Sequence, residues 1–87
     1  MYVIMMYDVN EKRVGKMPKK SRQFLTWIQN SVFEGELTEA KLEKFKIALK
    51  KIMNEQEDSV IFYYLKTTKY TEKEIIGKKL GGFNNII

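Results

Sequence analysis

The sequence predicts an α+β domain in which two helices cover one face of a single antiparallel sheet. Two runs, residues 2–7 and 59–65, are almost entirely apolar or aromatic and rich in Val, Ile and Tyr, which is typical of buried strands. Between them lie two stretches with helical spacing, separated by a pair of shorter strand-like segments. A chain of 87 residues has the length of one domain.

The first strand, residues 2–7, is followed by Asp8 and then by a break suited to a turn or helix cap. From Glu11 a helix is expected, because residues recur at helical spacing at Val14, Met17, Ser21, Phe24, Leu25 and Ile28. Gly15 and Pro18 both disfavour an ideal helix. Pro18 is expected to kink the helix or to mark its first turn, because proline lacks an N–H donor.

A hairpin is predicted next, with strands at 26–29 and 32–37 joined by a tight turn at Asn30-Ser31, since Asn tolerates positive φ. Thr38 is a good N-cap for a second helix that ends near Asn54. Apolar residues repeat along this helix in steps of three and four, at Leu42, Phe45, Leu49 and Ile52. After a charged turn, residues 59–65 form the last strand of this series.

The order strand, helix, strand, strand, helix, strand is that of the split βαβ, or ferredoxin-like, arrangement. It defines a βαββαβ domain over residues 1–65 with both helices on one face of the sheet. Residues 66–87 then form a C-terminal tail, whose apolar patches and three glycines predict one or two further strands.

Two strands of this sheet are apolar on both faces, although two helices can cover only one face. A sheet face open to water normally shows alternating polar residues. We therefore expect the second face to be covered, in part by the tail or, more economically, by a second copy of the chain in a two-fold homodimer.

Composition excludes several kinds of chemistry. With no cysteine and no histidine, the chain cannot use thiolates, histidine bases or zinc-thiolate sites. Hydrolysis would require carboxylates, hydroxyls, lysine or a hard ion such as Mg²⁺. The net charge of +5 favours polyanionic partners. We expect no signal peptide, no membrane segment and a cytoplasmic setting.

Asp8 has two interpretations. As a helix N-cap it would be an ordinary structural residue, and this interpretation is favoured for a single carboxylate. If the sheets of two subunits pack across a two-fold axis, however, two copies of Asp8 could together hold one Mg²⁺, which would relieve their repulsion. Such a site would supply the metal-activated water that phosphodiester hydrolysis needs in a chain without histidine.

The basic residues of the first helix could contact a phosphate backbone, and the candidates are Arg13, Lys16, Lys19 and Arg22. The alternative is an ordinary solvated helix face. Ser31 has no general base in sight, and from the residues alone it is a turn residue.

The segments "YDVN" at 7–10, "QNSVFEGELT" at 29–38 and "DSVIFYYL" at 58–65 together resemble a known family. This is the small CRISPR-associated protein of the spacer-adaptation complex, the Cas-two family. The resemblance covers residues 1–65 and extends less sharply into the tail. Pro18 departs from the family's first helix, which puts the geometry of the basic face in question.

The resemblance implies a ferredoxin-like homodimer, in which the C-terminal strand of one subunit joins the sheet of the other. It implies a dimer that bridges dimers of the larger CRISPR integrase and holds duplex DNA for spacer acquisition. It also implies Mg²⁺-dependent endonuclease activity on RNA or DNA. The family's metal-binding aspartate falls on Asp8, and its early arginine is matched by Arg13. Its motif serine and phenylalanine fall on Ser31 and Phe33, and the resemblance implies that both act with Asp8 as catalytic residues at the metal or substrate site.

Our main interpretation is therefore a DNA-binding adaptation dimer whose Asp8 pair binds Mg²⁺. A stand-alone metal-dependent ribonuclease is the alternative. A plain RNA-binding module is a third interpretation, but it would need exposed aromatic residues on an open sheet.

Overall fold

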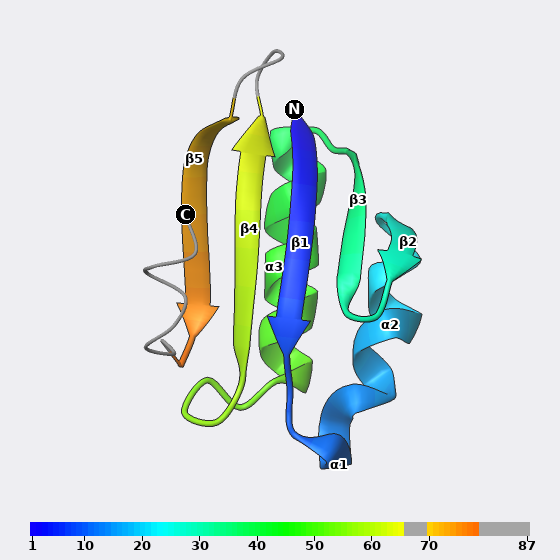
Figure 1. Cartoon of the computed structure of the whole chain (residues 1–87), viewed down its shortest axis with the longest axis vertical. Helices are drawn as coiled ribbons and strands as arrows, with labels where there is room; N and C mark the ends of the chain where they lie inside the picture. The colour runs from blue at the N-terminus through cyan, green and yellow to red at the C-terminus, as the bar shows by residue number, and fades with distance from the viewer. Residues whose placement is uncertain (66–69, 79–87) are drawn as a thin grey trace.

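A computed structural model describes residues 1–65 and 70–78. One antiparallel sheet has the strand order β2-β3-β1-β4-β5, and the helices lie on one of its faces (Figure 1). The predicted α+β, ferredoxin-like fold class is thus confirmed. The elements in chain order are β1 (Tyr2–Asp8), α1 (Glu11–Val14), α2 (Lys16–Ser21), β2 (Thr26–Gln29), β3 (Val32–Glu36), α3 (Glu39–Ile52), β4 (Ser59–Leu65) and β5 (Tyr70–Gly77).

The first helical region is shorter and more broken than its spacing predicts. It divides at Gly15 into α1 and α2, and α2 ends at Ser21. Pro18 is the third residue of α2, in the first turn, where a missing N–H costs no helical hydrogen bond. The prediction of helical spacing as far as Ile28 was wrong, because the chain must reach β2 at Thr26 to pair with β3.

The other local predictions hold closely. Asn30 adopts a φ of 44° in the turn between β2 and β3, as expected for a tight hairpin turn. Thr38 caps α3, because its hydroxyl oxygen accepts a hydrogen bond of 3.2 Å from the backbone N–H of Lys41. The predicted strands at 26–29 and 59–65 match β2 and β4.

The hydrophobic core lies between the sheet and the helices. Phe45 of α3 stacks on Phe24 at a ring-centroid distance of 4.7 Å and meets Phe62 of β4 edge-on at 6.0 Å. Fully buried side chains of the neighbouring strands complete it, among them Val3, Met5, Phe33 and Val60. These contacts fix the helix layer to the central strands.

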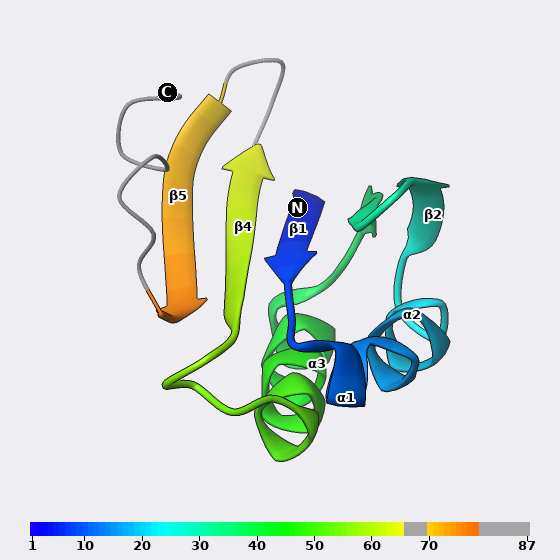
Figure 2. The same cartoon turned by 60° about the horizontal axis from the view of Figure 1, so that its bottom comes forward.

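The opposite face of the sheet carries a second set of apolar residues. Side chains alternate along a strand, so Ile4 and Met6 of β1 point away from the face that buries Val3 and Met5. In the register, Met6 lies opposite Ile61 of β4. Figure 2 shows the helices gathered on the other side of the sheet. We call this second side, with Asp8 at its end, the open face.

β5 confirms that a strand follows residue 65, and it pairs along β4 of its own chain. It ends at Gly77, whose φ of 94° favours glycine. A Cβ at this position would lie 2.2 Å from the carbonyl oxygen of Asp58. The prediction that tail segments join the partner's sheet remains a prediction, and residues 79–87 lie outside the described part of the chain.

Removing one hydroxyl is expected to stabilise the fold. Ser21 is fully buried, and its Oγ has no hydrogen-bond partner within the described residues. Ser21→Ala removes a desolvated polar group without breaking a bond, so we expect the free energy of unfolding to rise by about 1 kcal/mol. Urea denaturation measures it. The control Thr38→Ala removes a hydroxyl that does cap a helix, and should lower the same quantity by about 1 kcal/mol.

Candidate metal and nucleic-acid site

Asp8 is the last residue of β1 and lies on the open face. In the register it is opposite Ser59 of β4. It is exposed, and its carboxylate forms no hydrogen bond or ion pair with the described residues. The helix cap is Asn10, whose Oδ1 accepts a 3.0 Å hydrogen bond from the N–H of Lys12. The capping interpretation of Asp8 was therefore wrong, and its carboxylate is available to a ligand.

Asp8 could supply one ligand to a hard cation, but it could not form a protein site alone. A carboxylate oxygen is the ligand type that Mg²⁺ prefers. Within residues 1–65 and 70–78, however, no group of three carboxylates, histidines or cysteines gathers around a common point. A single chain thus provides one carboxylate at this position, and a complete protein site would need a second contribution.

Ser31 adjoins the end of β1, whereas Phe33 pairs with Met5, three residues before Asp8. The backbone carbonyl of Ser31 accepts a 3.2 Å hydrogen bond from the N–H of Tyr7, so this turn adjoins the end of β1. Phe33 is fully buried on the helix side, where its ring stacks on Tyr7 at a centroid distance of 6.2 Å. The structure shows a packing role for Phe33, and the catalytic roles of both residues stay predictions.

Tyr7 connects these residues to the basic end of α2. Burial raises the pKa of its phenol, while a hydrogen bond with Ser31 and the positive charge of Arg22 oppose that rise. Arg22 itself is exposed, like Lys16 and Lys19. These three candidates for phosphate contacts are thus accessible, and their binding role stays a prediction.

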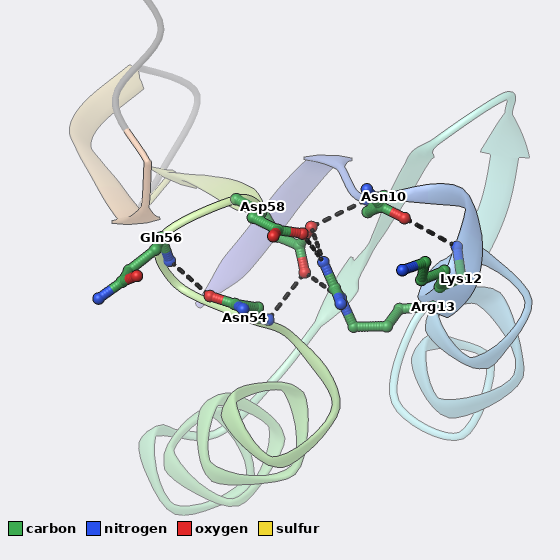
Figure 3. A network of polar contacts seen from close by, with 7 residues as sticks. Asn10, Lys12, Arg13, Asn54, Gln56 and Asp58 are labelled. Carbon is green, nitrogen blue, oxygen red and sulfur yellow. Dashed lines mark hydrogen bonds and ion pairs between the residues drawn. The ribbon is translucent and has the colours of Figure 1, made fainter.

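A network centred on Asp58 fixes the end of the sheet where Asp8 lies (Figure 3). The Asp58 carboxylate is fully buried and accepts four hydrogen bonds. Two come from the Arg13 guanidinium, at 2.7 and 3.0 Å. The others come from the backbone N–H groups of Asn10 and Asn54, both at 2.8 Å. Each of the two carboxylate oxygens therefore accepts two hydrogen bonds, and such bonds offset the cost of burying the charge.

These bonds keep Asp58 ionised. Burial alone would raise the pKa of its carboxyl, but the hydrogen bonds from Arg13, Asn10 and Asn54 outweigh burial and lower the pKa to about 2. Asp58 and Glu57 in turn raise the pKa of Arg13 above its usual value. The Asp58 carboxylate is thus negative and the Arg13 guanidinium positive at any pH near neutrality.

The network joins the turn after β1 to the loop before β4. Asp58 immediately precedes Ser59, the partner of Asp8, and its backbone carbonyl accepts a 2.7 Å bond from the N–H of Lys78. The network therefore fixes the backbone that follows Asp8, at Asn10, and the backbone paired with Asp8, at Ser59. Arg13 is engaged in this network, with a side-chain exposure of 20%, and its contact with nucleic acid stays a prediction.

Asp58 was not singled out from the sequence, which presents "EQED" only as a charged turn. A signal was nevertheless present. Asp58 directly precedes a strand apolar at nearly every position, just as Asp8 follows one, and a carboxylate beside a buried strand needs water, a partner or a metal. The partner, Arg13, lies 45 residues away in sequence, which no local pattern reveals.

The fold, with an exposed carboxylate at the end of its central strand, is that of a small ferredoxin-like domain. Comparison with known families matches the model of the CRISPR associated protein Cas2 to residues 1–73. The chain belongs to the Cas2 family.

Individual relatives agree. The chain is 58% identical over 77 residues, 88% of each chain, to a CRISPR-associated endoribonuclease Cas2 of Dictyoglomus turgidum. It is 51% identical over 81 residues, 93% of each chain, to one of Thermotoga maritima. A crystal structure of a cas2 protein superposes with a TM-score of 0.74 at 40% identity, covering 93% of this chain and 91% of the other.

None of the helices in the described part of the chain is long and apolar enough to span a membrane.

Proposed function

We propose that this protein is a homodimeric, Mg²⁺-dependent endonuclease of CRISPR defence, with RNA as a substrate. The observation that carries the proposal is the exposed carboxylate of Asp8, which has no partner among the described residues and lies at the end of an apolar sheet face. The names of the relatives, which describe CRISPR-associated endoribonucleases, support the RNA substrate.

The homodimer would form through the open face. Apolar side chains of β1 and β4 meet there, including Ile4 opposite Tyr63 and Met6 opposite Ile61. Ile61 is already buried at 3% exposure, but Met6 is 39% exposed, and Ile4 and Tyr63 are half-buried. An apolar surface of this kind on a small domain is typical of an association site, and two-fold dimers are the commonest association.

Packing the open faces around a two-fold axis would bring the two copies of Asp8 toward one another. Two nearby carboxylates repel unless a proton or a cation lies between them. The Asp8 pair would hold Mg²⁺, which when bound supplies a Lewis acid for phosphodiester hydrolysis. The Arg13–Asp58 network would keep the strand ends that carry this pair in place.

A second function rests on a different observation, the basic helix layer. Lys16, Lys19 and Arg22 are exposed on or next to α2, on the side of the sheet opposite the proposed interface. A dimer would therefore leave them free to contact duplex DNA. This arrangement favours the role in spacer acquisition, in which the dimer bridges dimers of the larger integrase while DNA lies on its basic faces.

The dimer is tested by mass. Light scattering in dilute, moderately salty buffer should give twice the chain mass. Met6→Glu places a charge on the open face and should give the mass of one chain, because a buried unpaired carboxylate is costly. The matched control is Ile47→Glu, since Ile47 is 54% exposed on α3, and its dimer should persist. A parent protein that is monomeric would contradict the proposal.

A further inference from the structure

The helix layer concentrates the positive charge of this protein. The three helices hold ten of the sixteen Lys and Arg residues but only three of the eleven Asp and Glu residues. The strands and loops therefore carry most of the acidic residues. A polyanion approaching the molecule would be attracted to the helix side of the sheet.

Within this layer, a shallow groove separates α2 from the end of α3. It has a volume of about 240 Å³ and is lined by Lys16, Lys19, Lys20, Gln23 and Ile52. Among the described residues, this lining contains no carboxylate and no aromatic ring. Three lysines of α2 thus line the groove together with Ile52, and the surface that faces the groove is mostly apolar, so the aliphatic stems of these lysines form much of its wall while their charged ends can reach its rim.

The facing flank of α3 is basic as well. Ile52 marks the flank that faces α2, and residues four apart on a helix share a flank. Ala48 and Lys44 therefore follow Ile52 along it. Lys51 lies at the outer edge of this flank, three residues after Ala48. Lys44 and Lys51 are exposed, and neither forms an ion pair within the part of the chain that the structure describes.

The other flank of α3 is different. There Lys46 forms ion pairs with Glu74 of β5 at 2.7 Å and with Glu43 at 3.6 Å. On this side, Glu43 of α3 and Glu74 of β5 thus pair with a lysine, whereas the lysines beside the groove form no ion pair with any described residue. Unpaired lysines on two facing walls repel one another, and a bound polyanion would relieve this repulsion.

We propose that the groove between α2 and α3 binds the phosphate backbone of duplex DNA, with Lys44 and Lys51 of α3 as its second wall. This inference rests on the DNA-binding role proposed above and assigns that role a surface beyond the first helical region. Seven residues of helix separate Lys44 from Lys51, a rise of roughly 10 Å. A duplex carries about six phosphate charges over that length.

The lining also favours a duplex over a single strand. Proteins that bind single strands stack bases on aromatic side chains, and the described lining offers none. Ammonium groups without aromatic partners contact phosphates and read no bases. Binding at the groove is therefore expected to depend on salt and little on sequence.

The test uses the full chain and a short fluorescent duplex DNA, with the dissociation constant measured over a range of salt concentrations. The double variant Lys44→Gln with Lys51→Gln should bind more weakly at every salt concentration, and its log–log salt slope should be shallower by about two. The control Lys50→Gln with Lys78→Gln removes the same charge at exposed positions away from the groove. Its slope should equal that of the parent.

The outcomes separate the groove from the wider proposal. If the parent fails to bind duplex DNA, the proposed DNA-binding role itself is wrong. If the parent binds but the Lys44/Lys51 variant keeps its slope, the groove inference is wrong and the wider role survives. An equal change in slope on the single strand of the same sequence would contradict the duplex assignment. Circular dichroism should be the same for all variants.

Discussion

Asp8→Asn is expected to reduce Mg²⁺-dependent cleavage of RNA by orders of magnitude. The substitution keeps the size of the side chain but removes the negative charge that attracts a hard cation. Asp8 is exposed, and Asn10 rather than Asp8 caps α1, so the fold loses no contact. Cleavage of a labelled RNA at saturating Mg²⁺ measures the effect. Dimer mass and circular dichroism should not change.

The matched control is Glu55→Gln, which removes an exposed carboxylate from the loop before β4 and should leave cleavage unaffected. Undiminished cleavage by Asp8→Asn would mean that the active site lies elsewhere. Spacer integration by the partner integrase offers a second readout. If the dimer acts there only as a bridge, integration should persist in Asp8→Asn, and its loss with an intact dimer would contradict the purely structural role.

Asp58→Asn is expected to cause the largest loss of stability. Asp58 is fully buried and accepts two hydrogen bonds from Arg13. Asparagine removes the buried charge that pairs with Arg13 and one of the two acceptor oxygens that serve four donors, so we expect a loss of roughly 3–5 kcal/mol. The free energy of unfolding of a small domain is only about 5–15 kcal/mol, so the variant should melt at a much lower temperature. Thermal unfolding by circular dichroism measures this.

Glu57→Gln is the matched control, because Glu57 binds the same guanidinium at 2.8 Å but is 54% exposed. Exposed ion pairs contribute about 0–1 kcal/mol, so its melting temperature should stay close to that of the parent. Equal losses in the two variants would mean that burial of Asp58 does not decide its contribution.

The Asp58–Arg13 pair also predicts how the free energy of unfolding falls at acid pH. The folded-state pKa of Asp58 is about 2, against an ordinary value of 3.8. Because the pKa of Asp58 is lower in the folded state than in the unfolded state, the ionised carboxylate stabilises the fold when the pH is above the unfolded-state pKa. This stabilisation is lost as the pH falls through the folded-state pKa. The parent should therefore lose on the order of 2 kcal/mol between pH 4 and 2 from this group. Asp58→Asn should lack this part of the profile.

The fold could be predicted from the sequence because its signals are local. The apolar runs of β1 and β4, the turn at Asn30 and the cap at Thr38 each depend on neighbouring residues. The first helical region was the exception. There the apolar residues keep helical spacing as far as Ile28, but the chain leaves the helix earlier because Thr26 pairs with Glu34 across the hairpin.

The site could be predicted only in part. Asp8 was identified because a carboxylate at the end of an apolar strand is unusual, but its position on the open face depends on the strand register. The Asp58 network depends on residues that meet only after folding, because Arg13 lies in α1 and Asp58 follows α3 in the chain. The role proposed for Lys44 and Lys51 likewise depends on the packing of α3 beside α2, where Ile52 and lysines of α2 line one groove.

The stoichiometry of metal binding tests the shared Asp8 site most directly. Titration of the dimer with Mn²⁺, a spectroscopic substitute for Mg²⁺, should show one ion per two chains, and Asp8→Asn should lose it. Met6→Glu, which is expected to be monomeric, should lose it as well while keeping Asp8. One ion per chain, or the same binding in Asp8→Asn, would contradict a site built from two copies of Asp8.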